Sequence, residues 1–185
     1  MTALYIVLVL VVLGVIYAVS LYNGLVRKRN IASEAESGID VQLKRRHDLI
    51  PNLVETVKGY AGHEKSVLTD VTMLRAQSMQ ATGMKEKAGL EAALTRSIGN
   101  LFAVAENYPD LKANQNFQQL QTDLTAIENE IQLARRFYNG AVRDYNTAIQ
   151  SFPAMLVAGS LGFAPREFFE LEDKGDRQTP TVNFS

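Results

Sequence analysis

The hydrophobic positions of the chain form one continuous block near its start and spaced stripes over much of the remainder. In residues 3–22 only Gly14 and Ser20 are not apolar, and no charged side chain occurs before Arg27. A helix over this block is about 30 Å long at roughly 1.5 Å per residue, which matches the hydrocarbon core of a bilayer. The pattern therefore predicts a transmembrane anchor over residues 1–23.

A cleaved signal peptide is the alternative interpretation of this block. Ala18-Val19-Ser20 loosely resembles a small-residue cleavage site. The segment lacks a basic n-region, however, and its apolar run exceeds the roughly 7–15 residues of a signal h-region. We therefore favour a retained anchor, and the residues that mark its two ends are Leu4, Tyr5 and Tyr22.

Three basic residues, Arg27, Lys28 and Arg29, directly follow the apolar block. By the positive-inside rule, they place the N-terminus outside and the rest of the chain in the cytoplasm. We expect a single-pass protein of the cell (inner) membrane, whose basic flank orients the anchor and contacts membrane lipid.

The strongest helical signal lies between Asn114 and Gln150. Its apolar residues are spaced by alternating threes and fours over more than four heptads, which predicts a long helix packed as in a coiled coil. The stripe consists of Phe117, Leu120, Leu124, Ile127, Ile131, Ala134, Tyr138, Ala141, Tyr145 and Ala148.

Shorter stripes predict further helices upstream, with a loop at Thr82-Gly83 and a break at Tyr108-Pro109, after which Asp110 could cap the next helix. We expect an all-α fold, in which the transmembrane helix is followed by an up-and-down bundle of three or four long helices within residues 24–152. The stripes are Ala32, Ala35, Ile39 and Leu43; then Ile50, Leu53, Val57, Tyr60, Val67, Val71 and Leu74; and, over about residues 86–106, Leu90, Leu94, Leu101 and Ala105.

Pro51 leaves two possibilities open. Inside a helix it removes one backbone hydrogen bond and clashes with the carbonyl of His47. Either the first helix kinks there and continues to Ser78, or it ends and Asp48 caps a new helix with Pro51 in its first turn. We favour the kink, because no loop-forming residues flank Pro51.

The chain after the long helix, residues 153–185, is expected to hold an apolar segment and a charged, flexible tail that frays beyond Asp173. The sequence FPAMLVAGSLGF over residues 152–163 is too short to cross a bilayer. It could cap its own bundle, dock onto a neighbouring subunit or insert partly into a membrane. Its candidate interaction residues are Phe152, Pro153, Leu156, Val157, Leu161 and Phe163.

The composition of the chain excludes several kinds of partner and site. The 185 residues carry a net charge of −1 and no Cys, so we expect no nucleic-acid partner, no disulfide scaffold and no thiolate metal site. We also expect no metal, no cofactor and no enzymatic activity, because neither His47 nor His63 lies in a zincin or di-iron spacing. Both are interpreted as surface or interface imidazoles, and Lys44-Arg45-Arg46 as a solvated helix face rather than a lipid-binding site.

Several blocks of the sequence resemble the LemA family of small bacterial membrane proteins. They are the run LYNGLV at residues 21–26 leading into Arg29-Asn30, and the stretches over residues 39–64, 108–146 and 149–153. The resemblance implies one N-terminal anchor, a cytoplasmic helical bundle and no firmly assigned activity. Two positions depart from the family, whose members often have an aromatic residue in place of Glu36 and Asn in place of Met155.

The resemblance also implies two associations, because family members are often encoded beside a heat-shock-type membrane metalloprotease and one branch is associated with magnetosome membranes. We therefore expect a non-catalytic, membrane-anchored scaffold that forms homo-oligomers, binds other membrane proteins through its cytoplasmic helices, or does both. The alternative is a regulator or adaptor of a membrane metalloprotease.

Overall fold

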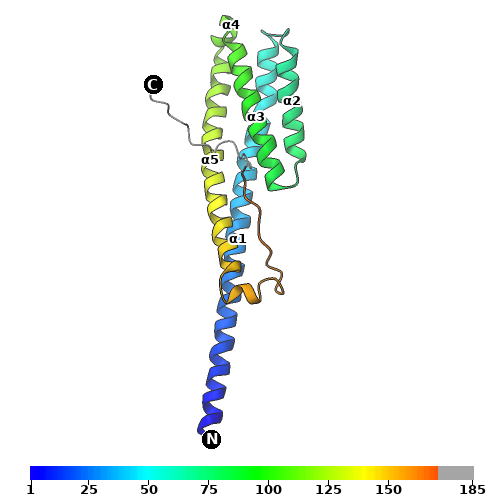
Figure 1. Cartoon of the computed structure of the whole chain (residues 1–185). Coiled ribbons are helices and arrows are strands. Elements are labelled where there is room, and N and C mark those ends of the chain that lie inside the picture. The colour runs from blue at the N-terminus through cyan, green and yellow to red at the C-terminus, as the bar shows by residue number, and fades with distance from the viewer. Residues whose placement is uncertain (171–185) are drawn as a thin grey trace, which may run out of the picture. The chain divides into compact units, whose positions relative to one another are not determined.

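The computed structural model describes residues 1–170, in which the secondary structure is helical and no strand occurs (Figure 1). This confirms the all-α prediction. The helices are α1 (Thr2–Lys58), α2 (Lys65–Gln80), α3 (Met84–Ala105), α4 (Pro109–Lys112), α5 (Gln115–Gln150) and the 3₁₀ helix η1 (Ala154–Leu156). The predicted frayed tail beyond Asp173 lies outside the described residues.

The chain divides into two compact units. Unit 1 contains residues 1–46 and 123–167, and unit 2 contains residues 47–122 with the described residues after Glu167. The long helices α1 and α5 contribute to both units.

The core of unit 1 is formed by the predicted stripes on α1 and α5. Side chains that recur every three or four residues lie on one face of a helix, so each helix buries one continuous stripe. Along α5 the buried positions shift late in the helix from Ala141 and Ala148 to Val142 and Ile149, which is the drift expected of a straight helix against a seven-residue repeat. The buried residues are Leu25, Ala32, Ala35, Ile39 and Leu43 on α1 and Leu124, Ile127, Ile131, Tyr138, Val142, Tyr145 and Ile149 on α5.

The core of unit 2 is built on the packing of α2 against α3. The two helices are separated by the short loop predicted at Thr82-Gly83. At the far end of α3, the ring of Phe102 meets that of Phe117 edge-on, with 5.9 Å between their centroids. The main buried residues are Ile50, Leu53, Val57, Leu68, Val71, Leu94, Leu101, Ala105, Leu111 and Phe117.

The structure decides between the two possibilities at Pro51, because α1 runs through it to Lys58. The alternative in which Asp48 caps a new helix is therefore wrong. The carbonyl of His47, which loses its usual donor at residue 51, instead accepts a hydrogen bond from Nε of Arg75 at 2.7 Å. A donor on α2 thus replaces the missing proline N–H.

The predicted continuation of the first helix to Ser78 is wrong, because α1 ends at Lys58 and α2 begins at Lys65. Gly59 and Gly62 lie in the gap, and two glycines within four residues weaken a helix. The gap is closed by short-range backbone bonds, including Ala61 N–H to Val57 O at 2.8 Å.

Two further local predictions are wrong. Asp110 lies inside the short helix α4, and the cap of α5 is Asn114, whose Oδ1 accepts from the N–H of Phe117 at 3.1 Å. Arg46 does not lie on a solvated face, because it is buried in unit 1 and its Nη1 pairs with Oε2 of Glu128 at 2.6 Å.

Candidate functional site: the end of unit 1 where α1 meets residues 152–167

The first part of α1 has the surface of a helix that faces lipid. Its most apolar window has a mean hydropathy of 2.8, and none of that window is buried. Leu4, Tyr5 and Tyr22 are all exposed, as residues at the ends of a span would be. By length and composition, α1 is the helix of the described chain that could cross a membrane.

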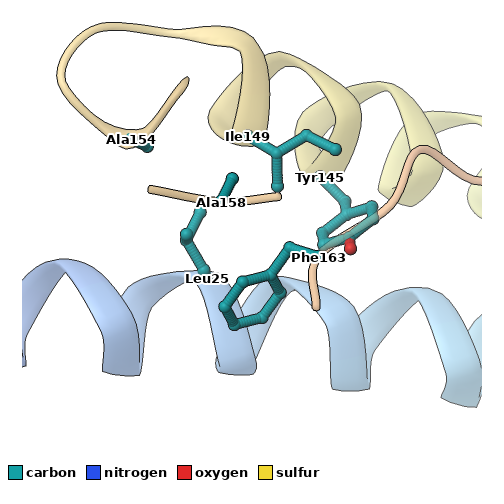
Figure 2. Packing of buried hydrophobic residues seen from close by; sticks show 6 residues of the cluster. All are labelled: Leu25, Tyr145, Ile149, Ala154, Ala158 and Phe163. Atoms are coloured by element: carbon teal, nitrogen blue, oxygen red, sulfur yellow. The ribbon is translucent and has the colours of Figure 1, made fainter. Parts of the chain in front are cut away.

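At the end of this apolar stretch, the segment that follows α5 packs against α1. The apolar loop, residues 152–163, packs part of its length onto α1 and the end of α5 (Figure 2). Ala154, Ala158 and Phe163 are buried against Leu25 of α1 and the α5 residues Tyr145 and Ile149. Leu21, Val26 and Ala148 pack at the edge of this cluster.

Phe163 anchors the apolar loop to α1 through two ring contacts. Its ring meets Tyr22 edge-on, with 5.7 Å between centroids, and the guanidinium of Arg29 lies 5.2 Å from its centroid. Tyr22 and Arg29 are seven residues apart, so they share one face of α1 two turns apart. Arg29 therefore makes a cation–π contact, whereas Arg27 is exposed.

The other side of the apolar loop is uncovered in the described chain. Phe152 and Leu156 have 78% and 69% of their surface exposed, and Met155, Val157 and Leu161 are exposed as well. Of the six predicted interaction residues, Phe163 is buried inside the unit and Pro153 is half-buried, whereas the other four face outward. The loop therefore both caps its own unit and presents an apolar surface.

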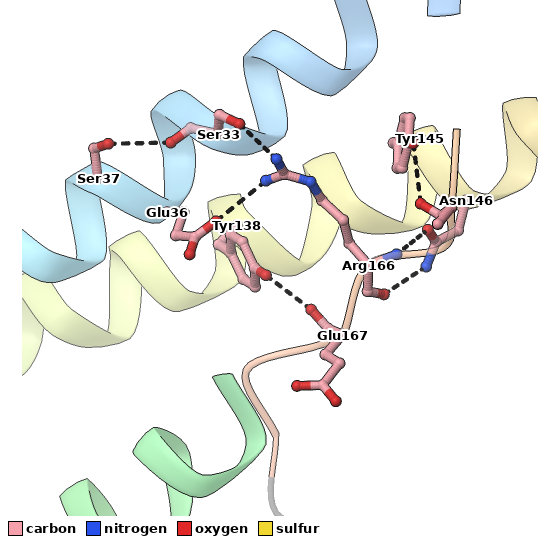
Figure 3. Close-up of polar contacts among 9 residues, drawn as sticks. Ser33, Glu36, Ser37, Tyr138, Tyr145, Asn146, Arg166 and Glu167 are labelled. Atoms are coloured by element: carbon pink, nitrogen blue, oxygen red, sulfur yellow. Dashed lines mark hydrogen bonds and ion pairs between the residues drawn. The ribbon is translucent and has the colours of Figure 1, made fainter. Parts of the chain in front are cut away.

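The strap, residues 164–167, fixes the loop through hydrogen bonds to α5 (Figure 3). Asn146 makes two of them, accepting at Oδ1 from the N–H of Arg166 and donating from Nδ2 to its carbonyl, both at 2.9 Å. The hydroxyls of Tyr145 and Tyr138 donate to the carbonyls of Ala164 and Glu167 at 3.0 and 2.8 Å.

The side chain of Arg166 extends from the strap to α1. Nη1 donates to Oε2 of Glu36 at 3.2 Å, and Nη2 donates to Oγ of Ser33 at 2.6 Å (Figure 3). Burial, followed by the negative charge of Glu36, raises the pKa of Tyr138 from 10.0 to about 12, although Arg166 opposes this rise. The hydroxyl of Tyr138 therefore stays protonated and able to donate at neutral pH.

A second polar cluster lies in unit 2 and involves His47. Nε2 of His47 is 2.7 Å from Oε1 of Glu91, and the hydroxyl of Ser78 donates to the same oxygen. All three side chains are buried, so of the two interpretations, surface or interface imidazole, the first is wrong for His47, whereas His63 is exposed. The carboxylate lies between the serine and the imidazole, unlike the order of a hydrolase triad, in which histidine contacts the nucleophile.

Within residues 1–170, no group of three or more His, Asp or Glu side chains is placed to hold a metal ion. The His47–Glu91–Ser78 cluster instead pairs polar groups that would otherwise be unsatisfied in the core of unit 2.

The LemA family model matches residues 35–184, which is most of the chain. The chain belongs to the LemA family. The matched range includes the loop, the strap and the buried cluster of His47, Ser78 and Glu91, and it begins beyond the apolar start of α1.

Three individual proteins are similar in sequence to this LemA-family chain. Magnetosome protein MamQ 1 of Paramagnetospirillum magneticum is 26% identical over 187 aligned positions, covering 87% of this chain and 68% of that protein. Magnetosome protein MamQ of Magnetospirillum gryphiswaldense matches with the same identity and coverage. Protein LemA of Metamycoplasma hominis is 28% identical over 160 positions, covering 85% of this chain and 73% of that protein.

Sequence reasoning on this LemA chain did not find the strap. Tyr138 and Asn146 lie eight residues apart on α5 and Arg166 lies 20 residues beyond Asn146, and each belongs to a residue type that is ordinary on a helix or in a tail. The signal that could have drawn attention to them is Pro165, which ends the apolar loop and favours an extended backbone beside it.

Proposed function

We propose that this LemA-family chain is a non-catalytic membrane scaffold, anchored by residues 3–22 with its helices in the cytoplasm, and that it self-associates through the outer face of α5. The anchor is supported by the exposed apolar start of α1. The orientation is supported by Arg27, Lys28 and Arg29, which directly follow it.

The observation that carries self-association is a pair of exposed apolar side chains on α5. Leu133 and Phe137 are 52% and 61% exposed and lie one turn apart, so they form one patch on the helix surface. Their neighbours Glu130 and Arg136 are exposed and charged. An apolar patch with a polar surround is typical of an interface.

A second copy of the chain is the occupant to which the geometry is best suited. Copies anchored by the same segment in the same membrane stand parallel, so a two-fold axis along the membrane normal brings Phe137 of each copy to the same height. Anchoring also confines the copies to two dimensions, which raises their effective concentration and lets a small patch suffice.

Disulfide crosslinking tests this proposal directly, because the chain has no Cys of its own. Phe137→Cys in isolated membranes should give a disulfide-linked dimer on mild oxidation. Gln132→Cys is the matched control, since Gln132 is exposed on the same helix but about 140° around it from residue 137, at roughly 100° per residue. Equal crosslinking at both positions would indicate random collision and would overturn the proposed face.

A membrane metalloprotease as partner is the other outcome of the test. Co-expressed copies with two different tags should co-purify in mild detergent, and Phe137→Glu should reduce recovery by about tenfold, because losing one large apolar contact costs about 1.5–3 kcal/mol. If the tagged copies do not co-purify but a protease subunit does, the self-association proposal fails and the adaptor alternative takes its place.

A further inference from the structure

We infer that the apolar loop, residues 152–163, inserts its exposed side into the headgroup layer of the membrane, beside the point where α1 leaves the bilayer. The inference rests on residues 3–22 being the anchor, as proposed above, and adds a second membrane-binding element. Its partner is a lipid surface.

The position of the loop along α1 is the first argument. The loop packs on Leu21, Leu25 and Val26, at the end of the apolar stretch that closes at Tyr22. Leu25 is only about 4.5 Å beyond Tyr22 at roughly 1.5 Å per residue. The headgroup region adds about 5–8 Å to each side of the hydrocarbon core. A loop held against Leu25 therefore lies at headgroup depth, beside the blue part of α1 in Figure 1.

The division of the loop into two sides is the second argument. Ala154, Ala158 and Phe163 are buried in one cluster with Leu25, Tyr145 and Ile149, and Figure 2 shows the ring of Phe163 beside Leu25. Apart from Phe163, the large apolar side chains of the loop are exposed, and no residue from 150 to 163 is charged. Segments that lie at a membrane surface bury an apolar face at the boundary between headgroups and acyl chains, and the exposed side of the loop is such a face. The outward side chains are Phe152, Met155, Leu156, Val157 and Leu161.

The backbone of the loop is also suited to a medium poor in water. Unsatisfied N–H groups are costly in lipid, so an inserted loop has to bond its own backbone. The loop is a series of tight turns in which most N–H groups from residue 155 to residue 163 donate to carbonyls of residues 151–159. The N–H groups that do so belong to Met155, Leu156, Val157, Ala158, Leu161, Gly162 and Phe163.

The basic residues of α1 that lie next to the loop provide the fourth argument. Arg27 is exposed on α1, and Lys28 and Arg29 are half-buried. Basic side chains beside an apolar surface attract anionic headgroups, and the two attractions act together at a membrane surface. The loop and the basic flank thus form one lipid-binding surface around the base of α1.

The experiment places single cysteines in the full-length chain, which has none, and labels them with an environment-sensitive bimane. The chain is reconstituted at one copy per nanodisc in phosphatidylcholine and phosphatidylglycerol. Bromine on the acyl chains quenches the fluorescence of nearby bimane. One set of nanodiscs carries bromine near the carbonyl end of the acyl chains, and a second set carries it in the middle of the acyl chains. Leu156→Cys reports on the loop and Val11→Cys on the anchor. Gln132→Cys, exposed on α5, is the aqueous control.

The expected result is loss of Leu156→Cys fluorescence with bromine near the carbonyls, and less loss with bromine mid-chain. This order follows from an insertion depth of about 5–10 Å. Quenching at Val11→Cys by mid-chain bromine, with none at Leu156→Cys, would overturn the inference and leave the anchor standing. Absence of quenching at Val11→Cys would instead overturn the anchor itself. Quenching of Leu156→Cys by iodide added to the buffer, as strong as that of Gln132→Cys, would place the loop in water and would also overturn the inference.

Discussion

Nε of Arg75 donates a hydrogen bond to the backbone carbonyl of His47 at 2.7 Å. His47 lies four residues before Pro51, so its carbonyl is the one that an N–H at residue 51 would normally meet in a helix. Arg75 on α2 therefore supplies the donor that proline lacks, and α1 continues through Pro51 to Lys58.

Replacing Arg75 tests this compensation. Arg75→Met keeps the aliphatic stem but removes the donor, which should lower the free energy of unfolding by about 1–3 kcal/mol, the typical cost of an orphaned buried acceptor. Urea unfolding of the detergent-solubilised full-length chain, followed by helical circular dichroism, measures the change.

Pro51→Ala provides the control in a double-mutant cycle, because an alanine at this position regains an N–H that can bond the carbonyl of His47. In that background the cost of Arg75→Met should fall by roughly 1 kcal/mol or more. The same cost in the presence of Pro51 and in the Pro51→Ala background would show that Arg75 acts through some other contact.

The buried carboxylate of Glu91 should be one of the most sensitive positions in unit 2. Glu91→Ala leaves His47 and Ser78 without their shared acceptor, so unfolding free energy should drop by about 2–4 kcal/mol. Glu91→Gln keeps an acceptor oxygen and should cost less. The matched control is Glu55→Ala, since Glu55 is exposed and pairs with Lys58 at 3.4 Å. It should change stability by no more than about 0.5 kcal/mol. Thermal unfolding that shifts equally for Glu91→Ala and Glu55→Ala would contradict the role given to the cluster.

The pairing of Arg166 with Glu36 and Ser33 should hold the strap in place. Arg166→Gln loses both contacts and should cost about 1–2 kcal/mol locally, a value reduced because Glu36 is partly exposed. The measurement is chymotryptic cleavage at Leu161 or Phe163, which should become faster as the loop opens. Arg143→Gln is the control, since Arg143 is exposed and only 3.6 Å from its neighbour Asp144. If Arg166→Gln is cleaved no faster than Arg143→Gln, Arg166 does not hold the strap in place.

Gly162 is the described residue with a positive φ, at +76°, and its N–H and that of Phe163 close the last turn of the loop. Gly162→Ala should cost about 1–2 kcal/mol from backbone strain alone, since an added Cβ would meet nothing within 4 Å. Gly159→Ala, in the same loop and equally open, should be neutral or slightly stabilising. Differential scanning calorimetry distinguishes the two variants. Equal melting temperatures would argue against the described turn.

The helices themselves could be predicted from the sequence because burial repeats with the period of the helix. The α5 stripe from Phe117 to Ala148 is buried or half-buried along its whole length, and the α3 boundaries differ from the prediction by two residues at most. The spacing of apolar residues within one segment is enough to predict a helix there, whatever the segment packs against.

The loops at Thr82-Gly83 and before Pro109 could be predicted, but the course of α1 through Pro51, its end at Lys58 and the polar contacts could not. The His47 carbonyl that Pro51 leaves without a donor is bonded by Arg75 from another helix, and α1 ends before Gly59 and Gly62 although the apolar stripe continues beyond them. Arg46 and Arg166 were ordinary charged residues in the sequence, because their partners Glu128 and Glu36 lie 82 and 130 positions away. Such contacts depend on the tertiary fold, which no local pattern encodes.

The central claim is that residues 3–22 cross the membrane and leave the helical units in the cytoplasm. Labelling of intact spheroplasts with a membrane-impermeant maleimide tests it through two single-cysteine variants, Thr2→Cys before the span and Ser37→Cys after it, both at exposed positions. The account predicts that Thr2→Cys is labelled from outside and that Ser37→Cys is labelled only after permeabilisation. Labelling of both cysteines from the same side would contradict a spanning helix, and the reverse order of labelling would contradict the cytoplasmic placement.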